Sequence, residues 1–153
     1  NSRQLIMLNI IAHRGLWKKV HEKNTLESFK LALVNGFGIE TDIRDFKGKL
    51  VISHDVPSAN CLTFEEFMNL VHHYPFQTLS LNIKSDGLQK LVKRDLGNYP
   101  EYFCFDMSVP DALGYIKNEL VFYTRYSDIE SQPCLITNAS GIWLDNFSSN
   151  TLD

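Results

Sequence analysis

Short apolar runs alternate with helix-like segments along most of the 153-residue chain. The runs are rich in branched and aromatic side chains, which is typical of strands buried on both faces of a sheet. The predicted strands are residues 5–12, 37–44, 50–53, 78–84, 102–107, 120–124 and 141–146. Because strands that alternate with helices form right-handed βαβ units, we predict an α/β fold with a parallel sheet.

The predicted helices have recognisable first residues. Asn24 has Glu27 three residues further on, and Thr63 has Glu66 at the same spacing, which is the pattern of a capping box. Ser108 precedes a third helical segment and is also a good cap. We therefore expect helices to begin directly after Asn24, Thr63 and Ser108.

The length of the chain restricts the parallel architecture. A complete (β/α)8 barrel, or TIM barrel, takes roughly 250 residues and rarely fewer than about 200. About six βα units can be counted, with residues 50–53 as an accessory hairpin arm. This number fits an open sheet or an incomplete (β/α)8 barrel whose C-terminal units are missing or trimmed. We expect one domain over residues 1–153, with unpaired edges at the first and last strands through which copies of the chain could associate.

Composition argues against several function classes. The chain has 15 Lys and Arg against 18 Asp and Glu, a net charge of −3, and no basic cluster that would suit nucleic acid. The longest apolar stretch, residues 5–12, is too short to cross a bilayer, and no signal-peptide pattern is present. Cys61, Cys104 and Cys134 lack paired spacing, so we expect buried free thiols in a cytoplasmic protein.

Polar residues suited to catalysis collect where the predicted strands end. In chain order they are His13-Arg14-Gly15, Asn24-Thr25, Glu40-Thr41-Asp42, His54-Asp55 and Asn82-Ile83-Lys84. Sites in parallel α/β folds form at the carboxyl ends of the strands, so we expect these residues to converge.

This ordered set resembles the motifs of the glycerophosphodiester phosphodiesterase family, a group of (β/α)8 barrels. The family pattern is HRG after the first strand, ENT at a helix start, E-x-D on the second strand, HD soon after it, and E-x-K on the third strand. The resemblance covers residues 10–84 and implies a hydrolase that releases glycerol 3-phosphate and an alcohol. Lys23 replaces the Glu of ENT, and Asn82 replaces the Glu of E-x-K.

The resemblance also implies a role for each residue. His13 and His54 would be the acid/base pair, Arg14 and Lys84 would contact phosphate, and Glu40, Asp42 and Asn82 would hold one divalent cation, Mg²⁺ or Ca²⁺. Neutral and protonated imidazoles coexist near neutral pH, and carboxylates two residues apart on a strand face the same way. An amide oxygen ligates a hard cation without adding charge, so affinity should fall unless Asp106 or Asp145 compensates.

Three interpretations stay open at the level of sequence. The first is a metal-dependent hydrolase of small-molecule phosphodiesters. The second is a weak or inactive relative that binds a phosphorylated ligand or a protein partner, which Asn82 and the short chain favour. The third is an unrelated open α/β domain, in which the two histidines and two carboxylates would not converge. Arg14 and Lys84 could also serve only as ion-pair partners of the carboxylates.

Overall fold

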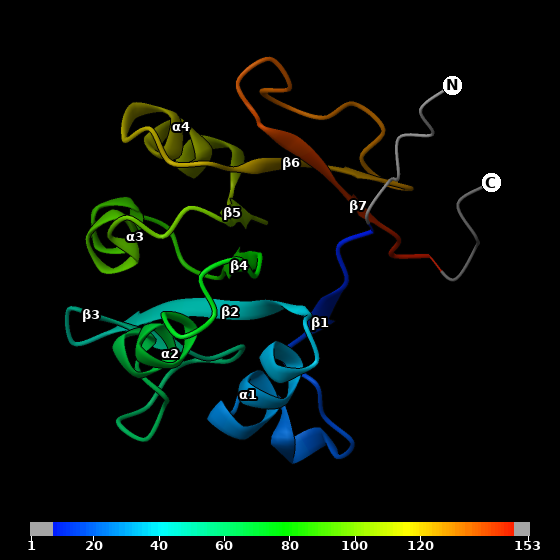
Figure 1. Ribbon diagram of the computed structural model, residues 1–153. Coiled ribbons are helices and arrows are strands. Elements are labelled where there is room, and N and C mark those ends of the chain that lie inside the picture. The colour runs from blue at the N-terminus through cyan, green and yellow to red at the C-terminus, as the bar shows by residue number, and fades with distance from the viewer. Residues whose placement is uncertain (1–7, 149–153) are drawn as a thin grey trace.

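The computed structural model describes residues 8–148, in which six parallel strands follow an arc with the helices on its outside (Figure 1). The strands are β1 Ile11–His13, β2 Gly38–Phe46, β3 Lys49–Ile52, β4 Leu79–Ile83, β5 Tyr102–Phe105, β6 Tyr123–Ser127 and β7 Gly141–Asp145. The helices are α1 Leu26–Val34, α2 Phe64–Val71, α3 Gln89–Leu96 and α4 Val109–Lys117, with a 3₁₀ turn at Val20–Glu22.

The strands form two sheets. The larger has the parallel order β1-β2-β4-β5, and β3 pairs antiparallel with β2 as the predicted hairpin arm. The smaller consists of β6 and β7, and a bridge between Cys104 and Phe122 connects its start to β5. Within residues 8–148, β1 pairs only with β2 and β7 only with β6, so the described strands do not close into a barrel. The fold is an open α/β arrangement of the TIM-barrel kind.

Two predicted caps are confirmed and one is wrong. The hydroxyls of Thr63 and Ser108 each accept a backbone N–H of the following helix, as expected. Helix α1, however, begins one residue later than predicted, because Thr25 is its N-cap and accepts the N–H of Ser28 at 3.3 Å. Asn24 has a left-handed φ of 58°, which Asn tolerates well, and its side chain turns toward the sheet.

Two strand predictions need correction. The first strand was predicted at residues 5–12 but spans Ile11–His13; residues 1–7 lie outside the described part of the chain. The sixth was predicted at residues 120–124 but spans Tyr123–Ser127. Leu120 and Phe122 are buried where the chain enters β6, and Phe122 forms only an isolated bridge with Cys104, so the ladder with β7 begins later, at Tyr123.

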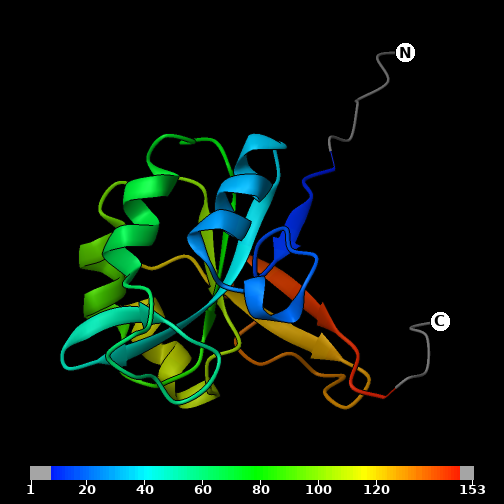
Figure 2. The ribbon, with the colours of Figure 1, turned by 90° about the horizontal axis from the view of Figure 1, so that it is seen from below.

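The segment between β6 and β7 contains no helix, so the arc has four helices for its six parallel strands. Figure 2 shows β6 and β7 extending away from the helices, accompanied by a loop.

The three cysteines differ in burial. Cys134 lies between β6 and β7 and is exposed, and Cys61 is half-buried, so the expectation of buried thiols holds only for Cys104. No helix of residues 8–148 has the length and apolar character that crossing a bilayer requires.

The two faces of the sheet carry different side chains. Ile39 and Ile43 of β2 belong to the apolar core beneath the helices, whereas Glu40 and Asp42 alternate with them and face the inside of the arc. Aromatic rings from β5, β6 and β7 also stack with one another: Phe103 on Tyr123, with centroids 3.9 Å apart, and Phe105 on Trp143, at 4.1 Å. These rings pack against one another where β5 meets the smaller sheet.

Removing a ring between helix α1 and helix α2 should destabilise the fold. Phe29 and Phe67 are fully buried and meet edge to face with centroids 4.9 Å apart. Phe67→Ala is expected to lower the free energy of unfolding by about 3–5 kcal/mol in urea titrations. Phe76→Ala is the matched control, because Phe76 is 85% exposed, and should change stability by less than about 0.5 kcal/mol. Equal losses in the two variants would contradict this packing.

Candidate active site

Two histidines lie near the same stretch of β2: His13 ends β1, and His54 follows the end of β3. The N–H of Arg14, directly after His13, donates to the carbonyl of Glu40 at 2.9 Å. The residue before His54 donates its N–H to the carbonyl of Asp42 at 3.1 Å. Because β3 runs antiparallel to β2, it returns the chain toward the end of β1. The hairpin arm therefore brings the second histidine to the strand end that carries the first.

Asp42 is fully buried and is the most heavily contacted carboxylate of the site. Arg14 Nε lies 3.0 Å and Lys84 Nζ 3.7 Å from its two oxygens. Asn24 Nδ2 donates to the same carboxylate at 3.0 Å, while Asn24 Oδ1 accepts the hydroxyl proton of Thr41 at 2.9 Å. Sequence reasoning missed this role of Asn24, because it treated the residue as a helix cap; the signal was its place within the ordered motif set.

Glu40 is also buried, at 3% exposure, but it has weaker charged partners. His13 Nε2 lies 3.7 Å from Glu40 Oε2, which also accepts the N–H of Arg14 at 3.2 Å. Burial, and then the negative charge of Asp42, raise the pKa of Glu40 to about 7. Burial, and then the charge of Arg14, lower the pKa of His13, which favours the neutral imidazole at pH 7. A neutral imidazole beside a partly protonated carboxyl is suited to proton exchange.

The inner face also offers oxygen atoms to a hard cation. Asn82 lies directly opposite Asp42 in the register of β2 and β4. Asp42 Oδ1 and Asn82 Oδ1 are both buried and accept no hydrogen bond within the described residues. With Glu40 they supply two carboxylates and one amide oxygen, which suits Mg²⁺ or Ca²⁺.

Two features weaken that cation site. No group of three or more His, Cys, Asp or Glu in residues 8–148 is arranged to hold a metal, since Asn82 stands where a third carboxylate is expected. Arg14 and Lys84 also already neutralise Asp42. The oxygen atoms therefore fit a hard cation, but one that has to compete with the protein's own cationic side chains.

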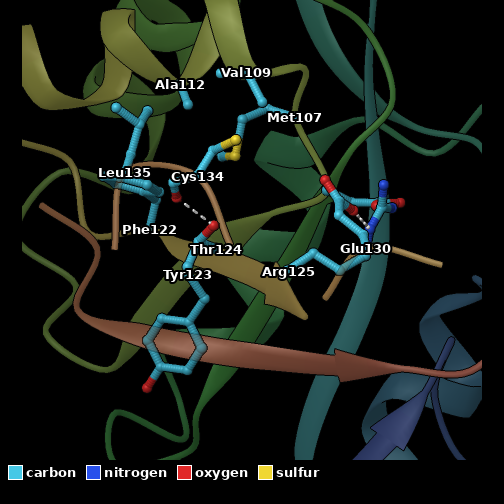
Figure 3. A pocket seen from close by; sticks show the side chains of 11 residues that line it. Met107, Val109, Ala112, Phe122, Tyr123, Thr124, Arg125, Glu130, Cys134 and Leu135 are labelled. Atoms are coloured by element: carbon cyan, nitrogen blue, oxygen red, sulfur yellow. Dashed lines mark hydrogen bonds and ion pairs between the residues drawn. The ribbon is translucent and has the colours of Figure 1, made fainter. Parts of the chain in front are cut away.

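A chain of ion pairs leads from this site to the smaller sheet. Lys84 Nζ lies 3.3 Å from Asp106 Oδ2 as well as 3.7 Å from Asp42. Arg125 Nη1 lies 2.5 Å from the other Asp106 oxygen, and its Nε lies 2.7 Å from Glu130. Figure 3 shows Arg125 and Glu130 together at one end of a small cavity of about 40 Å³ whose remaining wall is largely apolar. Both oxygens of Asp106 thus bind cationic side chains, so any compensation for Asn82 by Asp106 requires Lys84 to move.

The structure thus gathers the predicted site residues around the inner face of β2. Arg14 and Lys84 contact Asp42, and His13 contacts Glu40. His54 lines an open recess together with Arg14, and its Nδ1 lies 2.9 Å from Asp55 Oδ1. The roles assigned to these residues stay predictions.

Comparisons with solved structures identify the fold. A glycerophosphodiester phosphodiesterase from Parabacteroides distasonis matches with a TM-score of 0.63 and 18% identity, over 89% of this chain and 72% of its own. An Oleispira antarctica phosphodiesterase in complex with the product sn-glycerol-3-phosphate matches with a TM-score of 0.69 and 17% identity, over 90% and 74%. A glycerophosphodiester phosphodiesterase from Thermotoga maritima matches with a TM-score of 0.57 and 22% identity, over 86% and 67%.

The chain therefore has the fold of the glycerophosphodiester phosphodiesterases, the family whose motifs its sequence resembles. Comparison with models of known protein families and with proteins of curated function finds no match. The chain is thus a divergent example of this fold.

The raised pKa of Glu40 predicts a specific dependence of stability on pH. The folded protein holds the Glu40 proton up to about pH 7, whereas the unfolded chain releases it near its ordinary value of 4.5. Stability contributed by this group is therefore complete below pH 4.5 and is lost as the pH rises to about 7. In metal-free buffer at pH 8, Glu40→Gln should be more stable than the wild type by roughly 3 kcal/mol, measured by urea unfolding. The exposed Glu27→Gln is the control, and parallel pH profiles for wild type and Glu40→Gln would disprove the expectation.

Proposed function

We propose that the protein is a metal-dependent hydrolase that cleaves glycerophosphodiesters to glycerol 3-phosphate and an alcohol. The observation that carries the proposal is the placement of His13 and His54 beside the Arg14–Asp42–Lys84 cluster at the strand ends. The shared fold with glycerophosphodiester phosphodiesterases supports the reaction class. The sn-glycerol-3-phosphate product in the Oleispira antarctica phosphodiesterase supports the product.

The two histidines divide the proton transfers. His13, whose pKa is lowered, accepts the proton of the attacking water or substrate hydroxyl as that oxygen bonds to phosphorus. Attack by water gives glycerol 3-phosphate directly, whereas attack by a substrate hydroxyl gives a cyclic phosphodiester that water opens in a second step. Protonated His54 donates its proton to the departing alcohol oxygen as the phosphorus–oxygen bond breaks. Asp55 contacts His54 Nδ1 at 2.9 Å, which orients the ring and leaves Nε2 for the transfer.

The cationic side chains act on the phosphate. Arg14 and Lys84 are each 20% exposed, so both reach solvent while holding Asp42. Positive charge at these positions lowers the barrier by stabilising the negative charge that builds on the phosphoryl oxygens. Glu40, Asp42 and Asn82 would hold the divalent cation, which supplies further neutralisation of phosphate charge.

The second candidate function is a relative that binds a phosphorylated ligand without cleaving it. The specific observation in its favour is that Arg14 and Lys84 already neutralise Asp42. Such a site can attract an anion while its cation position is filled by side chains. This candidate predicts binding without turnover and no gain from added cation.

Loss of either histidine should separate these candidates. Hydrolysis of glycerophosphocholine with added Mg²⁺, Ca²⁺ or Mn²⁺ is expected for the wild type and should fall about 10²–10⁴-fold in His13→Ala and His54→Ala. His21→Ala, at an exposed residue on the 3₁₀ turn, is the matched control and should keep full activity. Full activity in both site variants, or no cation-dependent activity in the wild type, would refute the hydrolase proposal.

Restoring the third carboxylate should strengthen cation binding. Asn82→Glu adds a negative charge opposite Asp42 and is expected to raise the affinity for Mn²⁺ about tenfold or more in calorimetric titrations. Asn82→Gln has the side-chain length of Glu but keeps the neutral amide of Asn, so it should not raise the affinity for Mn²⁺. Equal Mn²⁺ affinity in wild type, Asn82→Glu and Asn82→Gln would show that these oxygens do not form a cation site.

A further inference from the structure

The recess beside His54 has a surplus of positive charge that the proposed reaction does not use. It is open, has a volume of about 410 Å³, and lies between the segment after β1 and the segment after β3. The charged and ionisable side chains that line it, apart from Cys61, are Arg14, Lys23, His54 and Asp55. Asp55, the single carboxylate of this lining, is 93% exposed and contacts His54. Arg14 is engaged with Asp42, so Lys23 is the cation in excess.

Lys23 is held in place without a carboxylate. Its Nζ lies 4.3 Å from the centroid of the Trp17 ring, and Trp17 Nε1 donates to the carbonyl of His13 at 2.9 Å. Through Trp17, the ammonium group is thus tied to the strand end that carries the first histidine. Burial and then the charge of Arg14 lower the pKa of His13, the charge of Asp42 raises it, and the charge of Lys23 adds a smaller lowering effect.

The nearest acidic residue in the chain does not pair with Lys23. Glu22 Oε2 accepts the N–H of Lys18 at 2.8 Å and that of Lys19 at 3.1 Å, which directs its carboxylate to the start of the 3₁₀ turn. None of the ion pairs formed within residues 8–148 includes Lys23. A partly buried ammonium group on an aromatic face, at the wall of a recess, is suited to bind an anion from solution.

We propose that Lys23 binds a second anionic group on the leaving alcohol of the substrate. The inference rests on the proposed function, in which His54 protonates the leaving alcohol and therefore places that alcohol in this recess. Arg14 and Lys84 take the phosphate of the diester, and Lys23 takes a carboxylate or similar anion beyond it. The substrate class is then a glycerophosphodiester with a negatively charged alcohol portion.

Two diesters that differ by one carboxylate test this preference. Glycerophosphoserine and glycerophosphoethanolamine share the phosphate and the ammonium group, and only the first has the carboxylate. The wild type should bind glycerophosphoserine about fivefold more tightly in calorimetric titrations at low ionic strength. The preference should shrink in 0.5 M NaCl, because a half-exposed ion pair is screened by salt.

Variants at position 23 assign the preference to this side chain. Lys23→Gln should bind the two diesters equally, and Lys23→Glu should favour glycerophosphoethanolamine. Lys30→Glu makes the same charge change at an exposed position of α1 outside the recess, and it should keep the wild-type preference. Equal wild-type affinities, or a preference that survives in Lys23→Gln, would overturn the inference.

Hydrolysis of both diesters, measured in parallel, distinguishes this inference from the proposed function. Cleavage of both with equal affinity overturns the role of Lys23 and leaves the hydrolase standing. If the preference for glycerophosphoserine depends on Lys23 but neither diester is cleaved, the binding role of Lys23 is supported and the hydrolase proposal is contradicted. If neither diester binds, both are overturned.

Discussion

The charge of Asp42 is the constraint around which the inner face of the sheet is built. A carboxylate with no exposed surface is costly unless cationic and hydrogen-bonding groups surround it. Arg14 and Asn24 from the segment after β1, and Lys84 from the end of β4, meet this requirement. The segment after β1, strand β2 and the end of β4 are thereby held together at one point. His13 directly precedes Arg14, and Ser53, the residue before His54, donates its N–H to the carbonyl of Asp42, so both histidines lie next to that cluster.

The same cluster extends beyond the larger sheet. Lys84 is shared between Asp42 and Asp106, and Arg125 is shared between Asp106 and Glu130. Since the two sheets are joined by a single bridge between Cys104 and Phe122 and by stacked rings, these ion pairs add polar contacts across the junction. Substitution of Lys84 therefore affects the candidate phosphate site and the attachment of β6 together.

Much of the fold was predictable because the periodicity is strong and local. A hydroxyl N-cap accepts the N–H of a residue only three positions further along the chain, so Thr63 and Ser108 were assigned correctly from local sequence. The errors share a cause in tertiary contacts. Asn24 is not the N-cap of α1 because its side-chain amide donates to the carboxylate of Asp42, eighteen positions further along the chain. The predicted sixth strand began too early because the buried apolar residues Leu120 and Phe122 precede the ladder with β7, which starts at Tyr123.

The sequence by itself determined the alternation of strands and helices, the order of the site motifs and the loss of charge at Asn82, since these depend on residue type and spacing alone. Only the tertiary structure decided which charges neutralise one another. Ion pairs depend on distances between segments far apart in sequence, as with Arg14 and Asp42 at 3.0 Å. It likewise placed Lys23 on Trp17 beside a recess without a carboxylate partner among the described residues. Lys23, which in the sequence only replaces the Glu of the ENT motif, is thereby a candidate determinant of substrate specificity.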